Sequence, residues 1–259
     1  MARGSAARLY LTRLQLNSGV SMQHTSPAEK ELLPFQQAVA TRGWAVTTPM
    51  FDAGTIAELR ASIAPLAQVG RGGARNLLDE PHIAGLAANP TLRKLAAAIL
   101  GQSCFAVRAL FFDKTPDANW KVVWHQDLTV ATQRRADVPG YGPWTDKAGV
   151  PHVQPPTHIL EHMLALRLHL DPCTADNGPV RVIDGTHRLG RLAPDAIDRL
   201  RAEQPESVCL ADEGAVLAFR PLLLHASSPA VQPAHRRVIH IEYAAQALPA
   251  PLIWHRQVA

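Results

Sequence analysis

Cysteine is scarce in this chain of 259 residues, which has three of them: Cys104, Cys173 and Cys209. They lie far apart in the sequence, and none belongs to a CxxC pair. This pattern argues against a disulfide-stabilised scaffold and against a zinc site built from thiolates. It fits a protein of the reducing cytoplasm, which is the location that we predict.

Long apolar runs are also missing, because no stretch of about 18 apolar residues occurs and no helix is therefore expected to cross a membrane. Residues 1–22 contain Arg3, Arg8 and Arg13 but lack the apolar block of a secretory signal. Met22 offers a second possible start besides Met1, and we expect residues 1–25 to form a flexible arm.

Runs of basic residues interleaved with aromatic residues are absent too, although the net charge is +4. The arginines are scattered along the chain, so no nucleic-acid-binding surface is predicted. A small molecule is the expected partner, and the chain is expected to be a monomer or a homodimer. With 47% hydrophobic residues, a sizeable core is possible, and residues 26–259 are predicted to form one domain.

The order of the predicted elements places helices before strands. Helices are expected at residues 26–41, 52–67, 90–100 and 194–203. Strands are expected at residues 44–49, 105–112, 122–130, 163–170, 180–183, 208–210, 215–219 and 236–244. Residues 176–179 have the composition of a hairpin turn, and residues 222–225 are expected to continue the strand at 215–219. Residues 131–157 are rich in proline and glycine and suggest an irregular, lid-like insert. This order predicts an α+β fold whose mainly β core forms a jelly roll or a barrel.

The most informative motif is His125-Gln126-Asp127, at the end of an apolar, β-branched run. In an extended strand, His125 and Asp127 point to one face and Gln126 to the other. A second histidine from elsewhere would complete the two-histidine, one-carboxylate triad of non-haem Fe(II) oxygenases. His225 is a candidate, since it ends an apolar run and distant strands of a jelly roll face each other. The simpler alternative is chance, because the chain contains 12 histidines.

Arg236 follows His225 by 11 residues and opens the last predicted strand. A guanidinium group that points into the barrel could bind a carboxylate through two parallel hydrogen bonds. Burying an arginine is costly unless it is paired, so an inward Arg236 implies an anionic ligand or an acidic partner. The alternative is that Arg236 and Arg237 alternate at a strand edge, with their charges in solvent.

A competing motif is His158-Ile-Leu-Glu161-His162, which matches the H-x-x-E-H pattern of some zinc peptidases. On a helix, this pattern places two imidazoles on one face with a glutamate beside them. Strand-like residues begin at Met163, however, which leaves room for barely two helical turns. A zinc hydrolase that uses these residues is therefore a weaker hypothesis.

A set of motifs resembles the phytanoyl-CoA dioxygenase family of Fe(II)- and 2-oxoglutarate-dependent oxygenases over roughly residues 34–245. In chain order these motifs are Phe112-Asp-Lys114, Asn119-Trp120, Trp124-His125-Gln126-Asp127, Leu168-His-Leu-Asp171, Asn177-Gly178-Pro179, Gly185-Thr186-His187-Arg188, His225-Ala-Ser227 and Arg236-Arg237. Thr186 stands where the family more often has serine. The resemblance implies a double-stranded β-helix (a cupin-like jelly roll) with N-terminal helices packed on its outside.

The resemblance also implies roles for individual residues. His125, Asp127 and His225 would bind Fe(II) and so form the catalytic centre, and Arg236 would bind the far carboxylate of the cosubstrate 2-oxoglutarate. Other residues expected near this cosubstrate are Ser227, Lys114 and Arg167, the last at a position where some members have tryptophan. Residues expected to shape the substrate pocket are Gln126, Asn119, Trp144, Gln154 and Arg75. Trp144 suits packing within the insert equally well.

The implied reaction uses O2 to hydroxylate an unactivated C–H bond of a small molecule and releases succinate and CO2. Halogenating relatives replace the metal-binding carboxylate by a small residue, so Asp127 favours hydroxylation, or desaturation and ring chemistry. The alternative from another functional class is a jelly-roll protein that binds a metal or a ligand without turnover.

Overall fold

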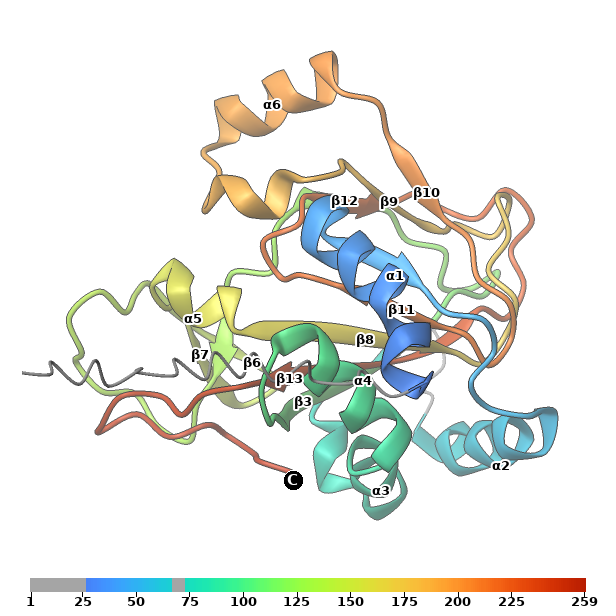
Figure 1. The fold of residues 1–259 in the computed structure, drawn as a ribbon, viewed down its shortest axis with the longest axis horizontal. Coiled ribbons are helices and arrows are strands. Elements are labelled where there is room, and N and C mark those ends of the chain that lie inside the picture. Colours follow the sequence, from blue (N-terminus) through green and yellow to red (C-terminus); the bar gives the residue numbers. More distant parts are fainter. Residues whose placement is uncertain (1–26, 67–72) are drawn as a thin grey trace, which may run out of the picture.

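Four helices precede most of the strands in the computed structural model, which describes residues 27–66 and 73–259 (Figure 1). The predicted N-terminal arm, residues 1–25, lies outside the described residues. The helices are α1 (Pro27–Arg42), α2 (Ala53–Ile63), α3 (Pro81–Ala87) and α4 (Pro90–Leu100). The Asp52 side chain accepts a hydrogen bond from the Thr55 amide (2.8 Å) and so caps α2. Gly101 ends α4 with a φ of 73°, a conformation that favours glycine.

Two antiparallel sheets form the core of the fold. The larger sheet has the strand order β1 (Trp44–Val46), β11 (Val216–Phe219), β8 (Met163–His169), β13 (Arg237–Ala244), β3 (Phe105–Asp113) and β2 (Gly73–Ala74). The smaller sheet has the order β10 (Ser207–Cys209), β9 (Val180–Val182), β12 (His225–Ser227) and β4 (Val122–His125). Neighbouring strands in these sheets are far apart in sequence, as expected of a jelly roll, so the predicted fold class is confirmed.

Alternation along the strands of the larger sheet separates its two faces. The face with Phe111, Leu166 and Ile241 packs against the helices in one hydrophobic core. Each of the four helices contributes an apolar side chain to this core, among them Val39, Ile56, Ile83 and Leu95. The opposite face, with Arg108, Arg167 and Glu242, points toward the smaller sheet. Polar side chains are thereby collected between the sheets, and the helices cover the outside.

Three sequence-based expectations are wrong in this region. The predicted strand at residues 122–130 is broken, because β4 ends at His125 and β5 (Val130–Ala131) pairs elsewhere. Residues 222–225 do not continue β11, because a turn follows it and β12 joins the other sheet. Residues 176–179 do not form a hairpin, since the chain passes there from β8 in one sheet to β9 in the other.

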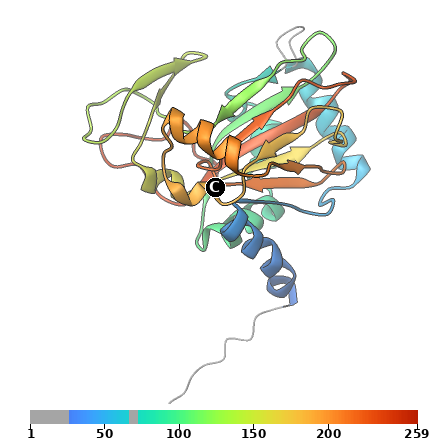
Figure 2. The same ribbon diagram turned by 90° about the horizontal axis from the view of Figure 1, so that it is seen from above.

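The insert at residues 131–157 has regular structure of its own, contrary to expectation. Strands β6 (Trp144–Lys147) and β7 (Val150–Val153) form a hairpin that pairs with β5 in a third sheet. Both turn residues, Ala148 and Gly149, have positive φ angles (52° and 77°), as a two-residue turn of type I′ requires. Figure 2 shows this small sheet projecting from one side of the two larger sheets.

Several smaller elements complete the described chain. They are the helix α5 (Thr157–Glu161), the helix α6 (Pro194–Glu203), which confirms a predicted one, and the 3-10 helices η1 (Ala64–Leu66), η2 (Leu77–Asp79) and η3 (Thr186–Leu189). Among the described helices, none is both long and apolar enough to cross a membrane.

The C-terminal segment fastens the insert to the rest of the fold. Trp254 is 2% exposed and packs in a hydrophobic cluster with Val130, Val153 and Leu160. Its indole nitrogen donates a hydrogen bond to the Gln246 carbonyl (3.1 Å), and its backbone forms a β-bridge with Thr132. A tryptophan in this position joins the tail, the insert and α5 in one packed unit.

Replacing this tryptophan should loosen that unit. We expect Trp254→Ala to lower the free energy of unfolding by about 3–5 kcal/mol, because a large buried side chain leaves a cavity. Ile253 is the matched control, since it is 46% exposed. Ile253→Ala should change the free energy by only roughly 0.5 kcal/mol. Chemical denaturation of both variants measures the difference, and equal stabilities would contradict this account of the tail.

Candidate metal centre

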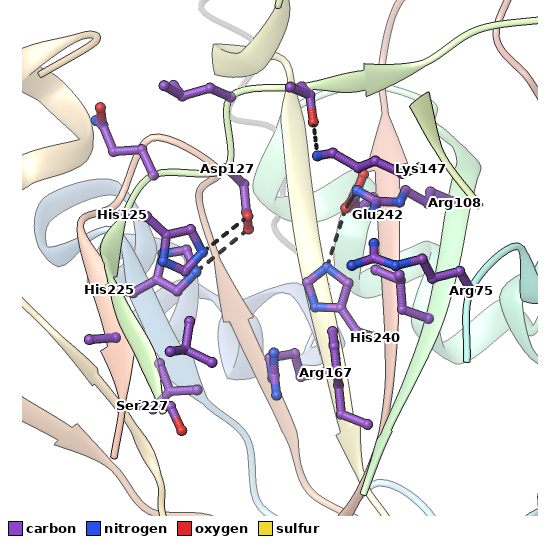
Figure 3. A pocket seen from close by; sticks show the side chains of 18 of the residues that line it. Arg75, Arg108, His125, Asp127, Lys147, Arg167, His225, Ser227, His240 and Glu242 are labelled. Atoms are coloured by element: carbon purple, nitrogen blue, oxygen red, sulfur yellow. Dashed lines mark hydrogen bonds and ion pairs between the residues drawn. The ribbon is translucent and has the colours of Figure 1, made fainter. Parts of the chain in front are cut away.

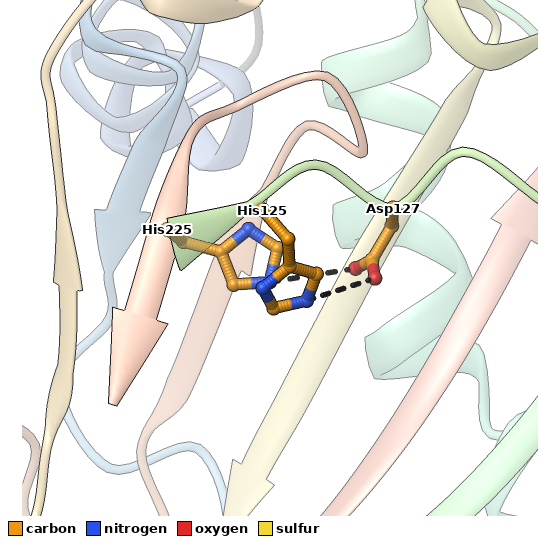
Figure 4. A group of neighbouring side chains, drawn as sticks. All are labelled: His125, Asp127 and His225. Carbon is orange, nitrogen blue, oxygen red and sulfur yellow. Dashed lines mark ion pairs between the residues drawn. The ribbon is translucent and has the colours of Figure 1, made fainter. Parts of the chain in front are cut away.

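Two histidines and one aspartate meet at the edge of the smaller sheet. Strand β12 pairs with β4 in a register that places His225 opposite His125, and the ring centroids lie 4.2 Å apart. Asp127 lies beyond the end of β4, where its amide donates a hydrogen bond to the Pro221 carbonyl (2.8 Å). Its carboxylate turns back toward both rings (Figure 4). The Oδ1 atom lies 3.6 Å from His125 Nε2, and Oδ2 lies 3.7 Å from His225 Nε2.

The orientation of both rings is fixed by backbone carbonyls. His125 Nδ1 lies 2.8 Å from the Val123 carbonyl, and His225 Nδ1 lies 2.9 Å from the Leu223 carbonyl. Each Nδ1 therefore carries the proton and donates it, which leaves the Nε2 lone pair directed toward Asp127. One ligand atom from each residue lies within 4.8 Å of the others. Within residues 27–66 and 73–259, this is the one group of three such side chains that could hold a metal ion.

The protonation states in this group favour a bound cation. Burial lowers the pKa of His225 to about 4, so its ring is neutral near pH 7. Burial alone would raise the pKa of Asp127, but its interactions with His225 and His125 outweigh this effect and hold the pKa below the usual range. A neutral imidazole and an ionised carboxylate are the forms that bind metals. His225 and Asp127 are therefore in their metal-binding forms near neutral pH. Burial alone would lower the pKa of His125, but its interaction with Asp127 outweighs this effect and raises it, so metal binding at His125 competes with a proton.

A cavity of about 510 Å³ extends from these residues between the two sheets (Figure 3). One end of it holds Lys114, Arg167 and Arg236, which are at most 9% exposed. None of these three cations has a carboxylate within 4.0 Å among the described residues. Lys114 donates hydrogen bonds to Ser227 Oγ (2.8 Å) and to the Ser228 carbonyl. We call Lys114, Arg167, Arg236 and Ser227 the deep cationic end.

Several buried donors at the deep cationic end have no hydrogen-bond partner among the described residues. They are Nε and Nη1 of Arg236 and Nε of Arg167. Burial, and then the charges of Arg236 and Arg167, lower the pKa of Lys114 to about 8. Burying like charges together is unfavourable unless an anion joins them. This end of the cavity is therefore suited to a carboxylate or a similar group.

The choice between Arg236 and Arg237 is decided by their surroundings. Arg237 turns away from the cavity and makes two hydrogen bonds to Asp171, from Nε to Oδ2 (2.8 Å) and from Nη2 to Oδ1 (2.7 Å). Arg236 is 2% exposed and lines the cavity. The two arginines thus alternate, one in and one out, but Arg236 is buried, so the alternative with a solvated charge is not what the structure has.

The opposite wall of the cavity carries residues that the sequence reasoning missed, apart from Arg75 and Gln154. Arg108 Nη1 forms an ion pair with Glu242 Oε1 (2.9 Å), and His240 Nε2 lies 3.5 Å from the same oxygen. Lys147 donates a hydrogen bond to Thr129 Oγ1 (2.7 Å). The sequence held a signal for this wall, because side chains at every second position of a strand point to the same face. Arg236, His240 and Glu242 are spaced in this way, and so are Arg108 and Lys114.

Three predicted pocket residues have contacts within the protein instead. The Gln126 amide nitrogen donates to the Gly190 and Leu222 carbonyls (2.8 and 2.7 Å), so both of its N–H groups are used, although the residue lines the cavity. Asn119 does not line the cavity; it exchanges two hydrogen bonds with the backbone of Ala230. Trp144 also lies outside the cavity lining and packs against the hydrophobic cluster around Trp254.

The competing zinc motif is not assembled. The helix α5 has five residues, and His158, Glu161 and His162 are exposed. His162 Nδ1 lies 2.7 Å from the His158 carbonyl, so it bonds the backbone. The described part of the chain does not bring these three side chains together as a metal group.

Comparisons with known proteins agree with this geometry. The model of the family "Phytanoyl-CoA dioxygenase (PhyH)" matches residues 58–238. No curated protein matches the chain.

Among solved structures, AviO1 from Streptomyces viridochromogenes Tue57 is 22% identical, with a TM-score of 0.63 over 84% of this chain and 96% of that one. EctD from S. alaskensis with bound Fe is 19% identical, with a TM-score of 0.63 over 84% and 79%. The non-heme alpha ketoglutarate dependent carbocyclase SnoK from nogalamycin biosynthesis is 12% identical, with a TM-score of 0.62 over 81% and 82%. At these identities, the structures show that the fold is shared.

Proposed function

The chain belongs to the phytanoyl-CoA dioxygenase family, and we propose that it is an Fe(II)- and 2-oxoglutarate-dependent dioxygenase acting on a small molecule. The observation that carries this proposal is the position of the triad of His125, Asp127 and His225 in a cavity that also holds the deep cationic end. A metal-binding group and a carboxylate-binding group in one cavity are what a 2-oxo dicarboxylic acid requires.

The donor set of the triad fits Fe(II). Two imidazoles and one carboxylate are the ligands of the facial triad, which leaves open coordination positions for the cosubstrate and O2. When bound, Fe(II) supplies the activation of O2 and the oxidation of the C–H bond. The overall reaction balances as R–H + O2 + 2-oxoglutarate → R–OH + succinate + CO2.

The deep cationic end would hold the far carboxylate of 2-oxoglutarate. Arg236 has two free buried donors for it, and a guanidinium group matches the planar geometry of a carboxylate. Lys114 and Ser227, already joined by a hydrogen bond, would add further donors. Arg167 would add positive charge beside Arg236. Its guanidinium group lies over the Phe112 ring, 5.2 Å from the ring centroid.

The type of oxidation is proposed to be hydroxylation. Asp127 occupies the carboxylate position, which leaves no place at the metal for a halide. Similar structures include an epimerase, SnoN, and a carbocyclase, SnoK, both described as alpha ketoglutarate dependent. The same residues would therefore also serve ring closure or epimerisation, and analysis of the product separates these outcomes.

Succinate release tests the proposed function. Purified protein supplied with Fe(II), 2-oxoglutarate and O2 should form succinate and CO2 slowly without substrate, and faster with it. His225→Ala should abolish succinate formation. Arg135→Gln is a control, since Arg135 is exposed and pairs with Asp146 outside the cavity. Binding of iron and 2-oxoglutarate without any succinate would support a non-catalytic binding protein instead.

The two adjacent arginines provide a matched pair for the cosubstrate site. Arg236→Ala should weaken 2-oxoglutarate binding by roughly 2–5 kcal/mol, the usual cost of removing one partner of a buried charged pair. Arg237→Ala should leave this affinity nearly unchanged and lower stability instead, because it removes the bonds to Asp171. Calorimetric titration measures both affinities. A larger loss of affinity in Arg237→Ala would contradict the assignment.

Lys114 makes the cosubstrate affinity depend on pH. Its pKa of about 8 means that it is charged below pH 8 and loses its proton above it. A bound carboxylate stabilises the charged form, so the affinity for 2-oxoglutarate should fall as the pH rises above about 8.

Two lysine variants provide the comparison. Lys114→Met should bind more weakly and lose this pH dependence, whereas Lys147→Met, at the other wall (Figure 3), should keep it. Titrations between pH 7 and pH 10 are the measurement, and a flat wild-type profile would contradict the role of Lys114.

A further inference from the structure

A second group of cations lies in the same cavity, away from the deep cationic end. It consists of Arg75, which follows β2, Arg108 on β3 and Lys147 on β6 of the insert. We call these three residues the outer cationic group. Figure 3 shows them at the opposite side of the cavity from the two histidines of the triad. Nothing in the proposed binding of iron or of 2-oxoglutarate uses them.

The outer cationic group has more positive than negative charge. Glu242 is its acidic neighbour, and it is engaged by Arg108, whose side chain is 13% exposed. Arg75 and Lys147 have no carboxylate within 4.0 Å in the part of the chain that the structure describes. Three cations face one carboxylate, so the group carries a charge of about +2 when all are ionised.

Holding these cations together costs free energy because their charges repel each other. Burial and then the charges of Arg108 and Arg75 lower the pKa of Lys147. Burial and then Arg108 lower the pKa of Arg75. Arg108 and Lys147 are only partly exposed, and they line one wall of the cavity together with the more exposed Arg75. An anionic ligand on this wall would remove the repulsion and complete the ion pairs.

The two cationic groups are separate sites. The charges of Arg236 and Arg167 lower the pKa of Lys114, whereas those of Arg108 and Arg75 lower the pKa of Lys147. Figure 3 shows Arg167 and Ser227 in one part of the cavity and Arg75, Arg108 and Lys147 in another. One anion bound at each group would thus occupy a different part of the cavity.

We propose that the substrate is an anion whose carboxylate or phosphate group is bound by Arg75 and Lys147, with Arg108 held in place by Glu242. This inference rests on the proposed function and names the class of its substrate. The cavity volume suits a small molecule that reaches from the outer cationic group to the triad. Because Lys147 belongs to the insert, the insert contributes directly to substrate selection.

Small anions test this proposal without knowledge of the substrate. The protein is loaded anaerobically with Fe(II) and saturated with 2-oxoglutarate, which fills the deep cationic end. Methyl phosphate, acetate and the neutral acetamide are then titrated by calorimetry. Methyl phosphate or acetate should bind, and acetamide should not. Tighter binding of methyl phosphate indicates a phosphate ester as the substrate, and binding of acetate at least as tight indicates a carboxylic acid.

Variants locate the binding of these probes. Lys147→Met and Arg75→Gln should each weaken it at least tenfold, whereas Arg135→Gln, also in the insert but outside the cavity, should not. Arg75 is the most exposed residue of the outer cationic group, so Arg75→Gln is the variant least prone to misfold. Equal binding in wild type, Lys147→Met and Arg75→Gln, or no binding of either anion to wild type, would overturn the proposal. Binding of 2-oxoglutarate and succinate release, measured on the same preparations, show separately whether the proposed function holds.

Discussion

The pairing of β12 with β4 is the constraint on which the candidate site depends. It sets His225 opposite His125, and the carbonyls of Leu223 and Val123 then fix the two rings. Because side chains alternate along a strand, a shift of the pairing by one residue would turn one ring away from the other. Asp127 joins the pair from beyond the end of β4, where its amide donates a hydrogen bond to the Pro221 carbonyl. The three ligand positions therefore come from one local arrangement of backbone hydrogen bonds.

Charge is distributed in the cavity so that two anions can be held beside one cation. The triad provides a carboxylate and two imidazole rings, and cations without carboxylate partners among the described residues occupy separate parts of the cavity. Such an arrangement is unfavourable for the protein alone, since buried charges of like sign repel each other. The proposed metal ion, dicarboxylate cosubstrate and anionic substrate would each offset part of this repulsion.

Much of this arrangement could be predicted from the sequence, and the exceptions have identifiable causes. The order of His125, Asp127, His225 and Arg236 along the chain already indicated the family. The break after His125 could not be seen, because it depends on a hydrogen bond to Pro221, which is distant in sequence. The hairpin of the insert was missed because its turn, Ala148-Gly149, lacks the asparagine or aspartate that usually marks a type I′ turn.

The residues of the opposite wall show what a single sequence leaves undetermined. Arg108 and Glu242 lie on different strands, and only the register between β3 and β13 places them opposite each other. Asn119 was expected in the pocket from its place beside a motif, yet its amide is used to hold the backbone of Ala230. A motif gives the ligands of a site, whereas the pairing of distant strands decides which other side chains surround them.

His125, Asp127 and His225 are proposed to form one metal site. Anaerobic titration with Fe(II), followed by measurement of the bound iron, tests it most directly. We expect one Fe(II) per chain in the wild type, and loss of the bound iron in Asp127→Ala and His225→Ala. His240→Gln, which changes another histidine of the same cavity, should retain the iron. Full iron occupancy in His225→Ala, or none in the wild type, would contradict the claim.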